Sequence, residues 1–379
     1  MRVALIHDWL TGMRGGEKVL EVLCELYPDA DIYTLYHQRG SVSPRIERHR
    51  ITTSFVQQLP FVDEHYRRYL PLFPLAIGQF RLTGYDLVIS SSHCVAKSAR
   101  APRGTPHLCY CHSPMRYAWD QFDAYFGPAR VGAVASRLLY GPVLRRLARW
   151  DAATADRVDR FVANSRHVAG RIRRYYDREA TIVYPPVDTA FFHPAAPSLD
   201  SHDGGPPDGG PFLIVSALVP YKRIELAMAA CERVGVPLRI VGSGPERDRL
   251  ARKASRDVTF VGHVSDEQIR DEYRRARAVL LPGEEDFGIV PVEAQACGRP
   301  VVALARGGAL ETVRDGETGV LFSEATVDAL AAALDRVRAT RFDSGRIRHH
   351  AEQFARARHV DQMKAVIDDT LAAPSGTRW

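Results

Sequence analysis

The sequence predicts an α/β protein built from two doubly wound, Rossmann-like domains. Its length of 379 residues is long for a single hydrophobic core. Short, continuously apolar segments alternate with helical segments, which is typical of parallel sheets covered by helices on both faces. This alternation stops once, in a segment rich in glycine, proline and aspartate, and then begins again. Two such sheets are therefore expected in succession.

The first domain is expected over residues 1–196. It opens with an apolar strand at 3–6, and a turn containing glycine then leads into a helix that begins near Glu17. The apolar residues of this helix recur with helical spacing. The same alternation predicts further strands at 87–90, 106–110, 160–163 and 181–184.

Residues 197–211 are expected to form the linker, because a run of Gly, Pro, Ser and Asp cannot fill a core. The second domain is expected over residues 212–353. A C-terminal helix of about residues 354–372 is a candidate to pack back on the first domain. Sheets of this kind bind ligands at the carboxyl ends of their strands, so the two domains are expected to face an interdomain cleft. Strands of the second domain are predicted at 212–215, 238–241, 258–261, 278–281 and 300–303.

The composition is that of an ordinary globular protein, with 45% hydrophobic and 25% charged residues. No apolar run approaches the roughly 18 residues that span a bilayer, and charge appears too early for a secretory signal. We therefore expect a cytoplasmic protein. Six cysteines are scattered along the chain, and the close pair Cys109 and Cys111 has the wrong spacing for a zinc knuckle or a redox motif. Buried, reduced thiols are expected.

The strongest functional signal is segment 283–294, Gly-Glu-Glu-Asp-Phe-Gly-Ile-Val-Pro-Val-Glu-Ala, which follows a predicted strand and leads into a helix. Pro291 lies at or near the first turn, where proline is favoured. Free N–H groups at the helix start would bind an anion, and a glycine lets the main chain approach it closely. The carboxylates of Glu285 and Glu293 are spaced to reach opposite ends of one elongated ligand. The alternative is that Glu285 is solvated and Glu293 only favours the helix N-terminus electrostatically.

This segment resembles the signature of glycosyltransferase family 4, the large retaining group with the two-domain GT-B fold. The resemblance rests on the E-x7-E spacing from Glu285 to Glu293, together with Phe287-Gly288 and Glu293-Ala294. It covers nearly the whole chain and implies an N-terminal acceptor-binding domain and a C-terminal domain that binds a nucleotide sugar. Further matching segments are 164–165, 184–188, 241–246, 306–311 and 315–319.

The resemblance implies roles for the residues of segment 283–294. Glu285 would face the transferred sugar, and Glu293 would hold the ribose of the donor. Backbone amides would bind the sugar hydroxyls and the diphosphate, namely those of Phe287, Gly288, Ile289 and Val290.

A second element is segment 216–223, Ser-Ala-Leu-Val-Pro-Tyr-Lys-Arg, which follows a predicted strand. Family members commonly place Arg and Lys here to neutralise the leaving diphosphate, because breaking the glycosyl–phosphate bond builds negative charge on the phosphate. Lys222 fits this role, whereas Ala217 stands where the family has arginine. Arg223 or Arg306 could supply the missing charge, or the backbone could suffice. The alternative is that Lys222 is an ordinary solvated loop lysine.

The first domain contributes weaker candidates. Gly15-Gly16 opens the first helix, and its amides could meet the diphosphate, although most double glycines are simply turns. His112 ends an apolar strand where the family places a histidine that contacts the donor sugar; otherwise it is a structural histidine. His93 is a second candidate of the same kind. Asp8 ends the first strand and could meet the acceptor hydroxyl.

Neither a metal ion nor another cofactor is expected. No Asp-x-Asp motif follows a strand in the expected context, so Lys222 and helix amides are expected to take the place of a cation. Segment 242–244, Gly-Ser-Gly, lacks the third glycine of a dinucleotide fingerprint, which argues against a dehydrogenase.

The net charge of +6 admits nucleic acid, acidic lipid or a phosphorylated small molecule as a partner. Segments 61–80 and 131–149 interleave basic residues with aromatic and aliphatic ones, which suits an anionic membrane surface or a lipid-diphosphate acceptor. The alternative is amphipathic helices that pack on the core and leave a basic face in water. The membrane hypothesis depends on exposed Tyr69, Phe73 or Leu139 and on the arginines Arg137, Arg145, Arg146 and Arg149.

Segments 6–18 and 216–223 most resemble the bacterial O-antigen mannosyltransferase branch. This implies a retaining hexosyltransferase that moves mannose from GDP-mannose to a lipid-diphosphate-linked oligosaccharide or surface polysaccharide, peripherally on the inner face of the cytoplasmic membrane. One alternative is a UDP-sugar donor. Another is a non-catalytic, basic nucleotide- or nucleic-acid-binding protein, against which the pair Glu285 and Glu293 and the second Rossmann-like domain argue. Nucleic acid is therefore not expected as a partner.

Overall fold

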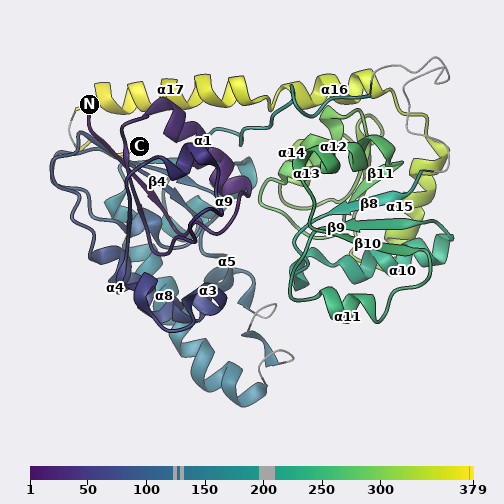
Figure 1. Cartoon of the computed structure of the whole chain (residues 1–379), viewed down its shortest axis with the longest axis horizontal. Coiled ribbons are helices and arrows are strands. Elements are labelled where there is room, and N and C mark those ends of the chain that lie inside the picture. The colour runs from purple at the N-terminus through teal and green to yellow at the C-terminus, as the bar shows by residue number, and fades with distance from the viewer. Residues whose placement is uncertain (123–125, 129–131, 196–209, 375) are drawn as a thin grey trace. The chain divides into compact units, whose positions relative to one another are not determined.

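The computed structural model describes residues 1–122, 126–128, 132–195, 210–374 and 376–379. The chain forms two compact units (Figure 1). Unit 1 comprises Met1–Pro186 and His359–Trp379, and unit 2 comprises Val187–Arg358. The N-terminal part of the first unit thus ends at Pro186, before the expected boundary at residue 196. Most of the expected linker lies outside the described residues.

The described part of unit 1 holds a parallel sheet in the order β3-β2-β1-β4-β5-β6-β7. Its central strands β1, β4, β5 and β6 are buried along their whole length, because helices cover both faces of the sheet. The strands are β1 (Val3–His7), β2 (Asp31–Thr34), β3 (Ile51–Thr53), β4 (Leu87–Ser92), β5 (His107–Cys111), β6 (Arg160–Ala163) and β7 (Thr181–Ile182).

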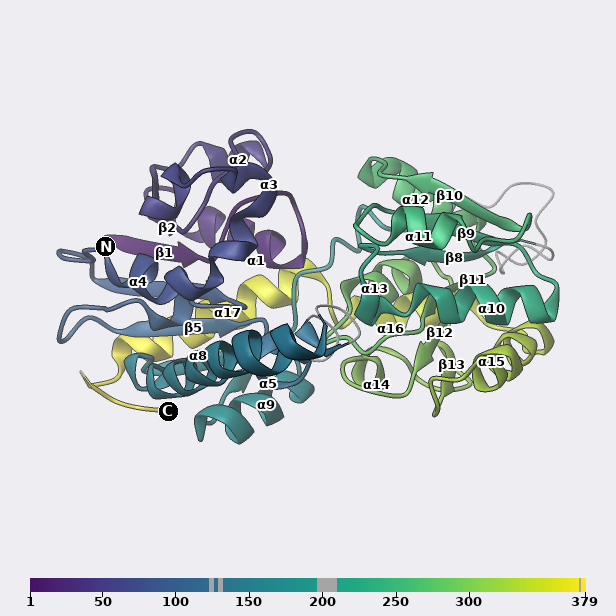
Figure 2. The ribbon, with the colours of Figure 1, turned by 90° about the horizontal axis from the view of Figure 1, so that it is seen from below.

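The helices of unit 1 include the C-terminal helix α17, which packs on the sheet of this unit. Met363, Val366 and Ile367 of α17 belong to one hydrophobic core with Leu108 of β5 and Leu20 of α1. Figure 2 shows α17 in yellow beside β5. The helices are α1 (Gly15–Leu26), α2 (Pro44–Glu47), α3 (Val62–His65), α4 (Phe73–Gly78), α5 (Arg116–Trp119), α8 (Gly141–Ala153), α9 (Arg166–Tyr176) and α17 (Arg356–Ala372).

Unit 2 contains a second parallel sheet, in the order β10-β9-β8-β11-β12-β13 among the described residues (Figure 2). The strands are β8 (Phe212–Val215), β9 (Leu238–Val241), β10 (Val258–Gly262), β11 (Ala278–Leu281), β12 (Val301–Leu304) and β13 (Gly319–Phe322). The helices are α10 (Ile224–Val234), α11 (Arg247–Ala251), α12 (Asp266–Arg275), α13 (Ile289–Ala296), α14 (Ala309–Thr312), α15 (Val327–Ala339) and α16 (Ser344–Glu352).

The prediction of two Rossmann-like domains is confirmed. All the predicted strands are present, and β2, β3 and β13 extend the sheets beyond them. All six cysteines are buried and form no disulfide, as expected. In each sheet the chain reverses its winding direction between two neighbouring strands, β1 and β4 in unit 1 and β8 and β11 in unit 2. Ligands bind beyond the carboxyl ends of the strands at such points.

Candidate active site

In unit 2, the switch point brings Lys222 and Glu285 together. Lys222 ends a short turn of helix after β8, and Glu285 lies in the loop after β11. The lysine Nζ forms an ion pair and hydrogen bond with Oε1 of Glu285. The two side chains are only 19% and 9% exposed. The interpretation of Lys222 as a solvated loop lysine is therefore wrong, and so is that of Glu285 as a solvated carboxylate.

Glycines allow the loops of unit 2 to touch at this point. A Cβ atom at Gly283 would lie 2.4 Å from the carbonyl oxygen of Tyr221, and one at Gly307 would lie 2.2 Å from that of Glu285. The N–H of Gly308 donates to the carbonyl oxygen of Glu285 over 2.9 Å. The loops after β8, β11 and β12 are therefore locked together by backbone contacts that only glycine permits.

Helix α13 begins directly after this loop. Gly288 caps it with a φ of 85°, which a residue without a side chain adopts easily. Ile289 and Val290 form its first turn, where N–H groups lack intrahelical partners. Phe287 is buried, whereas residues 288–290 are only half-buried. This start of α13 is the arrangement that the sequence predicted for an anion.

Glu293 lies farther along α13 than the first turn and is buried. The hydroxyl of Tyr273, from α12, donates to its Oε2 over 2.9 Å. Burial and then the neighbouring Glu293 carboxylate raise the pKa of Tyr273 well above its usual value, so the tyrosine remains a donor. Nothing in the sequence marked Tyr273, because its part depends on the packing of α12 against α13.

The remaining basic candidates of unit 2 differ from Lys222. Arg223 is exposed and adopts a φ of 52°, in the left-handed region that is uncommon for a residue with a side chain. Arg306 is exposed as well, and so is Ala217. That Arg223, Arg306 or the backbone supplies the charge missing at Ala217 therefore stays a prediction.

In unit 1, the corresponding point gathers His112, Gly15 and Gly16. Nε2 of His112 lies 2.7 Å from Oγ of Ser91, and a Cβ atom at Gly16 would lie 3.6 Å from the same nitrogen. The backbone of His112 is held by Ser92 and by the side chain of Asn164. Burial, followed by the nearby histidines His93 and His7, lowers the pKa of His112 well below its usual value. His112 is therefore a neutral imidazole beside the start of α1.

Asp8 has a structural part, and its contact with the acceptor hydroxyl stays a prediction. Its side chain is fully buried, and the carboxylate accepts the N–H groups of residues 93–96 over 2.7–2.9 Å. His93 Nδ1 lies 3.2 Å from the same carboxylate, and the His93 side chain is 32% exposed. Its ring meets Trp9 edge-on with centroids 4.4 Å apart. Of this pair, His93 reaches the surface and Asp8 does not.

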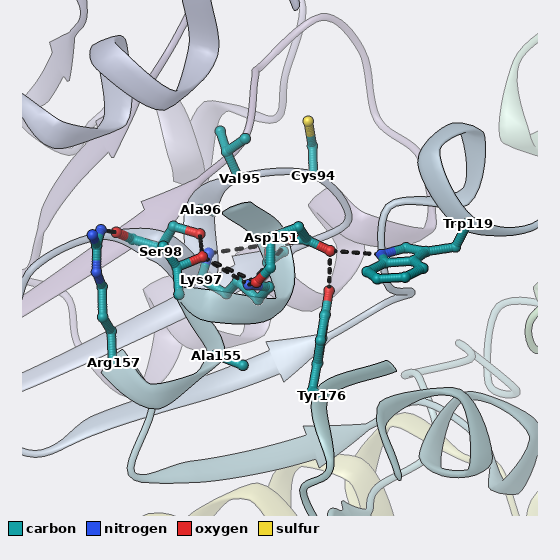
Figure 3. A network of polar contacts seen from close by, with 12 residues as sticks. Cys94, Val95, Ala96, Lys97, Ser98, Trp119, Asp151, Ala155, Arg157 and Tyr176 are labelled. Atoms are coloured by element: carbon teal, nitrogen blue, oxygen red, sulfur yellow. Dashed lines mark hydrogen bonds and ion pairs between the residues drawn. The ribbon is translucent and has the colours of Figure 1, made fainter. Parts of the chain in front are cut away.

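A buried polar network holds the other end of the loop that carries His93 (Figure 3). Lys97 Nζ donates to the carbonyl oxygen of Asp151 over 2.6 Å and forms an ion pair with its Oδ1 at 3.1 Å. Trp119 Nε1 and the Tyr176 hydroxyl each donate to Oδ2 of Asp151 over 2.8 Å. Both charged side chains are almost completely buried. The loop after β4 is thus anchored to α8 and α9. The hydrogen bonds around the ion pair offset the cost of removing its two charges from water.

Two family models match the chain. The model described as Glycosyltransferase Family 4 matches residues 13–191, and the model described as Glycosyl transferases group 1 matches residues 203–358. The D-inositol 3-phosphate glycosyltransferase of Mycolicibacterium smegmatis is 33% identical over 245 residues, which cover 59% of this chain and 55% of that protein. The chain thus spans about half the length of the curated relatives it matches.

Solved structures share the fold. HepE of Anabaena, in complex with UDP, is 16% identical with a TM-score of 0.68, and the match covers 97% of this chain and 100% of that one. Sucrose-phosphate synthase of Thermosynechococcus elongatus is 22% identical with a TM-score of 0.73, over 99% and 100% of the two chains. The two halves of the chain thus match two glycosyltransferase family models in succession, and each half has the Rossmann-like fold that these solved structures share.

Proposed function

We propose that the protein is a retaining hexosyltransferase that transfers mannose from GDP-mannose to a lipid-diphosphate-linked oligosaccharide or surface polysaccharide. The observation that carries this proposal is the ion pair between the half-buried Lys222 and the buried Glu285 beside the start of α13. A cation fixed in a poorly solvated place stabilises the negative charge that develops on a leaving diphosphate. Its carboxylate partner, Glu285, contacts the transferred sugar in this proposal.

The other residues have assigned parts in this proposal. Amides of α13, from Phe287 to Val290, bind sugar hydroxyls and the diphosphate, and Glu293 binds the ribose. From unit 1, the amides of Gly15–Gly16 bind the diphosphate, and His112 contacts the donor sugar. No metal ion or cofactor takes part, because Lys222 and the helix amides supply the positive charge.

Calorimetric titration with GDP-mannose, GDP, UDP-glucose and UDP tests the donor. We expect GDP-mannose and GDP to bind and the uridine nucleotides to bind more weakly. HepE, which shares the fold, is described in complex with UDP-glucose, so a UDP-sugar is the second candidate and preferential binding of UDP-glucose would establish it. Binding of no nucleotide sugar would contradict the proposed activity.

Transfer should also persist in EDTA, and a reversible requirement for magnesium or manganese would reveal a metal-dependent mechanism.

Alanine at Gly15 or Gly16 is expected to lower transfer without lowering stability. Neither glycine has a positive φ, and an added methyl group would meet nothing within 4 Å at Gly15 and the His7 ring at 3.4 Å at Gly16. Replacing glycine in a helix stabilises by about 0.4–1 kcal/mol. The methyl group would nevertheless hold the diphosphate away from the amides, which we expect to slow transfer by roughly tenfold to a hundredfold.

Steady-state kinetics and thermal unfolding check this expectation. Gly170→Ala is the matched control, because Gly170 is an exposed glycine within α9 with open space around its Cβ position. The control should keep full activity. Full transfer by the Gly15 and Gly16 variants would remove these amides from the donor site.

We also propose that unit 1 docks reversibly on an anionic membrane. In segment 61–80 Phe73 is buried, so the prediction that Phe73 is exposed is wrong, but Phe61 and Leu75 are 77% and 68% exposed. In the other segment, Leu138 and Leu139 are 72% and 57% exposed. They precede the exposed arginines of α8, Arg145, Arg146 and Arg149. Among the described residues, no helix is long and apolar enough to cross a bilayer.

Binding to liposomes with anionic lipid is expected at low salt and should weaken as salt is added. Each arginine near the surface contributes roughly 1 kcal/mol of attraction within a Debye length. Replacing Arg145, Arg146 and Arg149 together with serine should therefore weaken binding strongly in a sedimentation assay. Replacing Arg81, Arg100 and Arg103, which are exposed elsewhere on unit 1, changes the net charge equally and should have little effect. Equal losses in the two triple variants would contradict docking through α8.

A further inference from the structure

A chain of buried polar side chains leads to His112 beneath the start of α1. Glu17, His7 and Ser91 are its members, and all three are buried. The Glu17 carboxylate lies 3.9 Å from Nε2 of His7, and Nδ1 of His7 lies 3.1 Å from Oγ of Ser91. The same Oγ lies 2.7 Å from Nε2 of His112. One serine hydroxyl therefore stands between two imidazoles.

The carboxylate of Glu17, at the inner end of this chain of side chains, determines which ring nitrogen of His7 carries the proton. Burial alone would raise the pKa of Glu17, but its electrostatic interaction with His7 and its backbone contact lower it below the usual value, so Glu17 is an anion. Among the described residues, Nε2 of His7 has no hydrogen-bond partner. An N–H at Nε2 is attracted by the nearby anion, whereas a lone pair there is repelled. A neutral His7 therefore carries its proton on Nε2 and accepts at Nδ1.

The Ser91 hydroxyl then determines which ring nitrogen of His112 carries the proton. A hydroxyl has one proton to donate, and Nδ1 of His7 requires it. The Ser91 oxygen is consequently left to accept a hydrogen bond from His112, and only the protonated form of Nε2 can donate it. This leaves a lone pair on Nδ1 of His112.

We infer that Glu17, His7 and Ser91 are positioning residues that hold His112 in the tautomer protonated at Nε2. In that tautomer Nδ1 accepts a hydrogen bond, so the imidazole selects a hydroxyl donor such as a sugar hydroxyl. The part that concerns the sugar rests on the proposed function. The tautomer itself depends only on the contacts within unit 1.

Long-range proton–nitrogen NMR of protein labelled with ¹⁵N-histidine reads the tautomer directly. The spectra are recorded near pH 8, where an ordinary imidazole, with a pKa of about 6.5, is neutral. In the wild-type protein we expect both His7 and His112 to be protonated at Nε2 alone. A doubly protonated His7, or His112 protonated at Nδ1, would overturn the inference without any variant being made.

Ser91→Ala should convert His112 into a mixture of tautomers and lower kcat by roughly tenfold, the value of one lost hydrogen bond. Ser90→Ala is the matched control, since the Ser90 hydroxyl is equally buried on β4 and lies 2.8 Å from Nε2 of a different histidine, His107. The control should cost similar stability but leave His112 and kcat unchanged. An unaltered His112 spectrum in the Ser91 variant would overturn the inference.

Glu17→Gln provides a second variant of nearly equal volume. Removing the charge should weaken the preference of His7, and so of His112, for a single tautomer. A single Nε2-protonated tautomer that survives in this variant would contradict the part given to the carboxylate. The expected tautomers in a protein that binds no nucleotide sugar would support the hydrogen-bonded chain while contradicting the proposed function, so the two failures are distinguishable.

Discussion

Replacing Lys222 with methionine is expected to reduce kcat/KM for sugar transfer by about a hundredfold, which corresponds to about 3 kcal/mol of lost stabilisation of the transition state. The reason is the low exposure of the ammonium group, since water cannot replace a charge that is held in a poorly solvated place. Glu285→Gln should reduce transfer similarly, because it removes the carboxylate from the same point.

Stability and activity separate in the double variant. Either single change leaves one member of a largely buried ion pair uncompensated, which destabilises by at most about 3 kcal/mol, the lower end of the range for fully buried pairs. Combining Lys222→Met with Glu285→Gln removes both charges, so the melting temperature in calorimetry should recover while transfer does not. Lys253→Met is the control, because Lys253 forms an exposed ion pair with Glu225 at 2.6 Å in the same unit. Transfer close to the wild-type rate in the Lys222 variant would overturn the site.

Asp8→Asn is expected to destabilise unit 1 by about 3 kcal/mol or more. Each hydrogen bond to a charged group contributes about 1.5–3 kcal/mol, and the Asp8 carboxylate accepts from the N–H groups of residues 93–96. An asparagine turns one of the two accepting oxygens into a donor that faces other donors. The loop that carries His93 should loosen first.

Urea denaturation followed by tryptophan fluorescence measures this effect in one unit, because all four tryptophans of the chain, at positions 9, 119, 150 and 379, belong to unit 1. Asp86→Asn is the control. Asp86 is an exposed carboxylate near the other end of β4, and it accepts the N–H of Arg2 over 2.7 Å; its loss should cost under about 1 kcal/mol. A stable Asp8 variant that loses transfer would support the contact of Asp8 with the acceptor hydroxyl.

Much of the fold could be predicted because parallel strands buried on both faces appear in the sequence as continuous apolar runs. Segment 212–215 was predicted as a strand and forms β8 with the same bounds. The start of α13 was predictable for a related reason, since glycine and proline mark a helix N-terminus locally. These features depend on residues that are neighbours in the sequence.

The pairing of side chains could not be predicted in the same way. Lys222 and Glu285 meet because β8 and β11 are adjacent in the sheet, and strand order is a property of the whole unit. Lys97 resembles a surface lysine in the sequence, yet it is nearly inaccessible to solvent because α8 supplies Asp151. The structural part of Asp8 was not predictable either, because its partners lie after β4 and bind it through their backbone.

The return of α17 to unit 1 has a consequence for the order in which the molecule is made. During synthesis the strands of unit 1 leave the ribosome before unit 2, and α17 leaves it after unit 2. The apolar face that receives Met363, Val366 and Ile367 therefore stays uncovered while unit 2 is synthesised. Arg160 of β6 also lacks hydrogen-bond acceptors at this stage, because its guanidinium donates to the carbonyl oxygen of Val366 and to the hydroxyl of Thr370, both in α17. Unit 2, whose strands are contiguous in the sequence, can close its core before the unit that precedes it. The nascent chain therefore passes through a stage in which unit 2 is complete while unit 1 still exposes an apolar surface to chaperones.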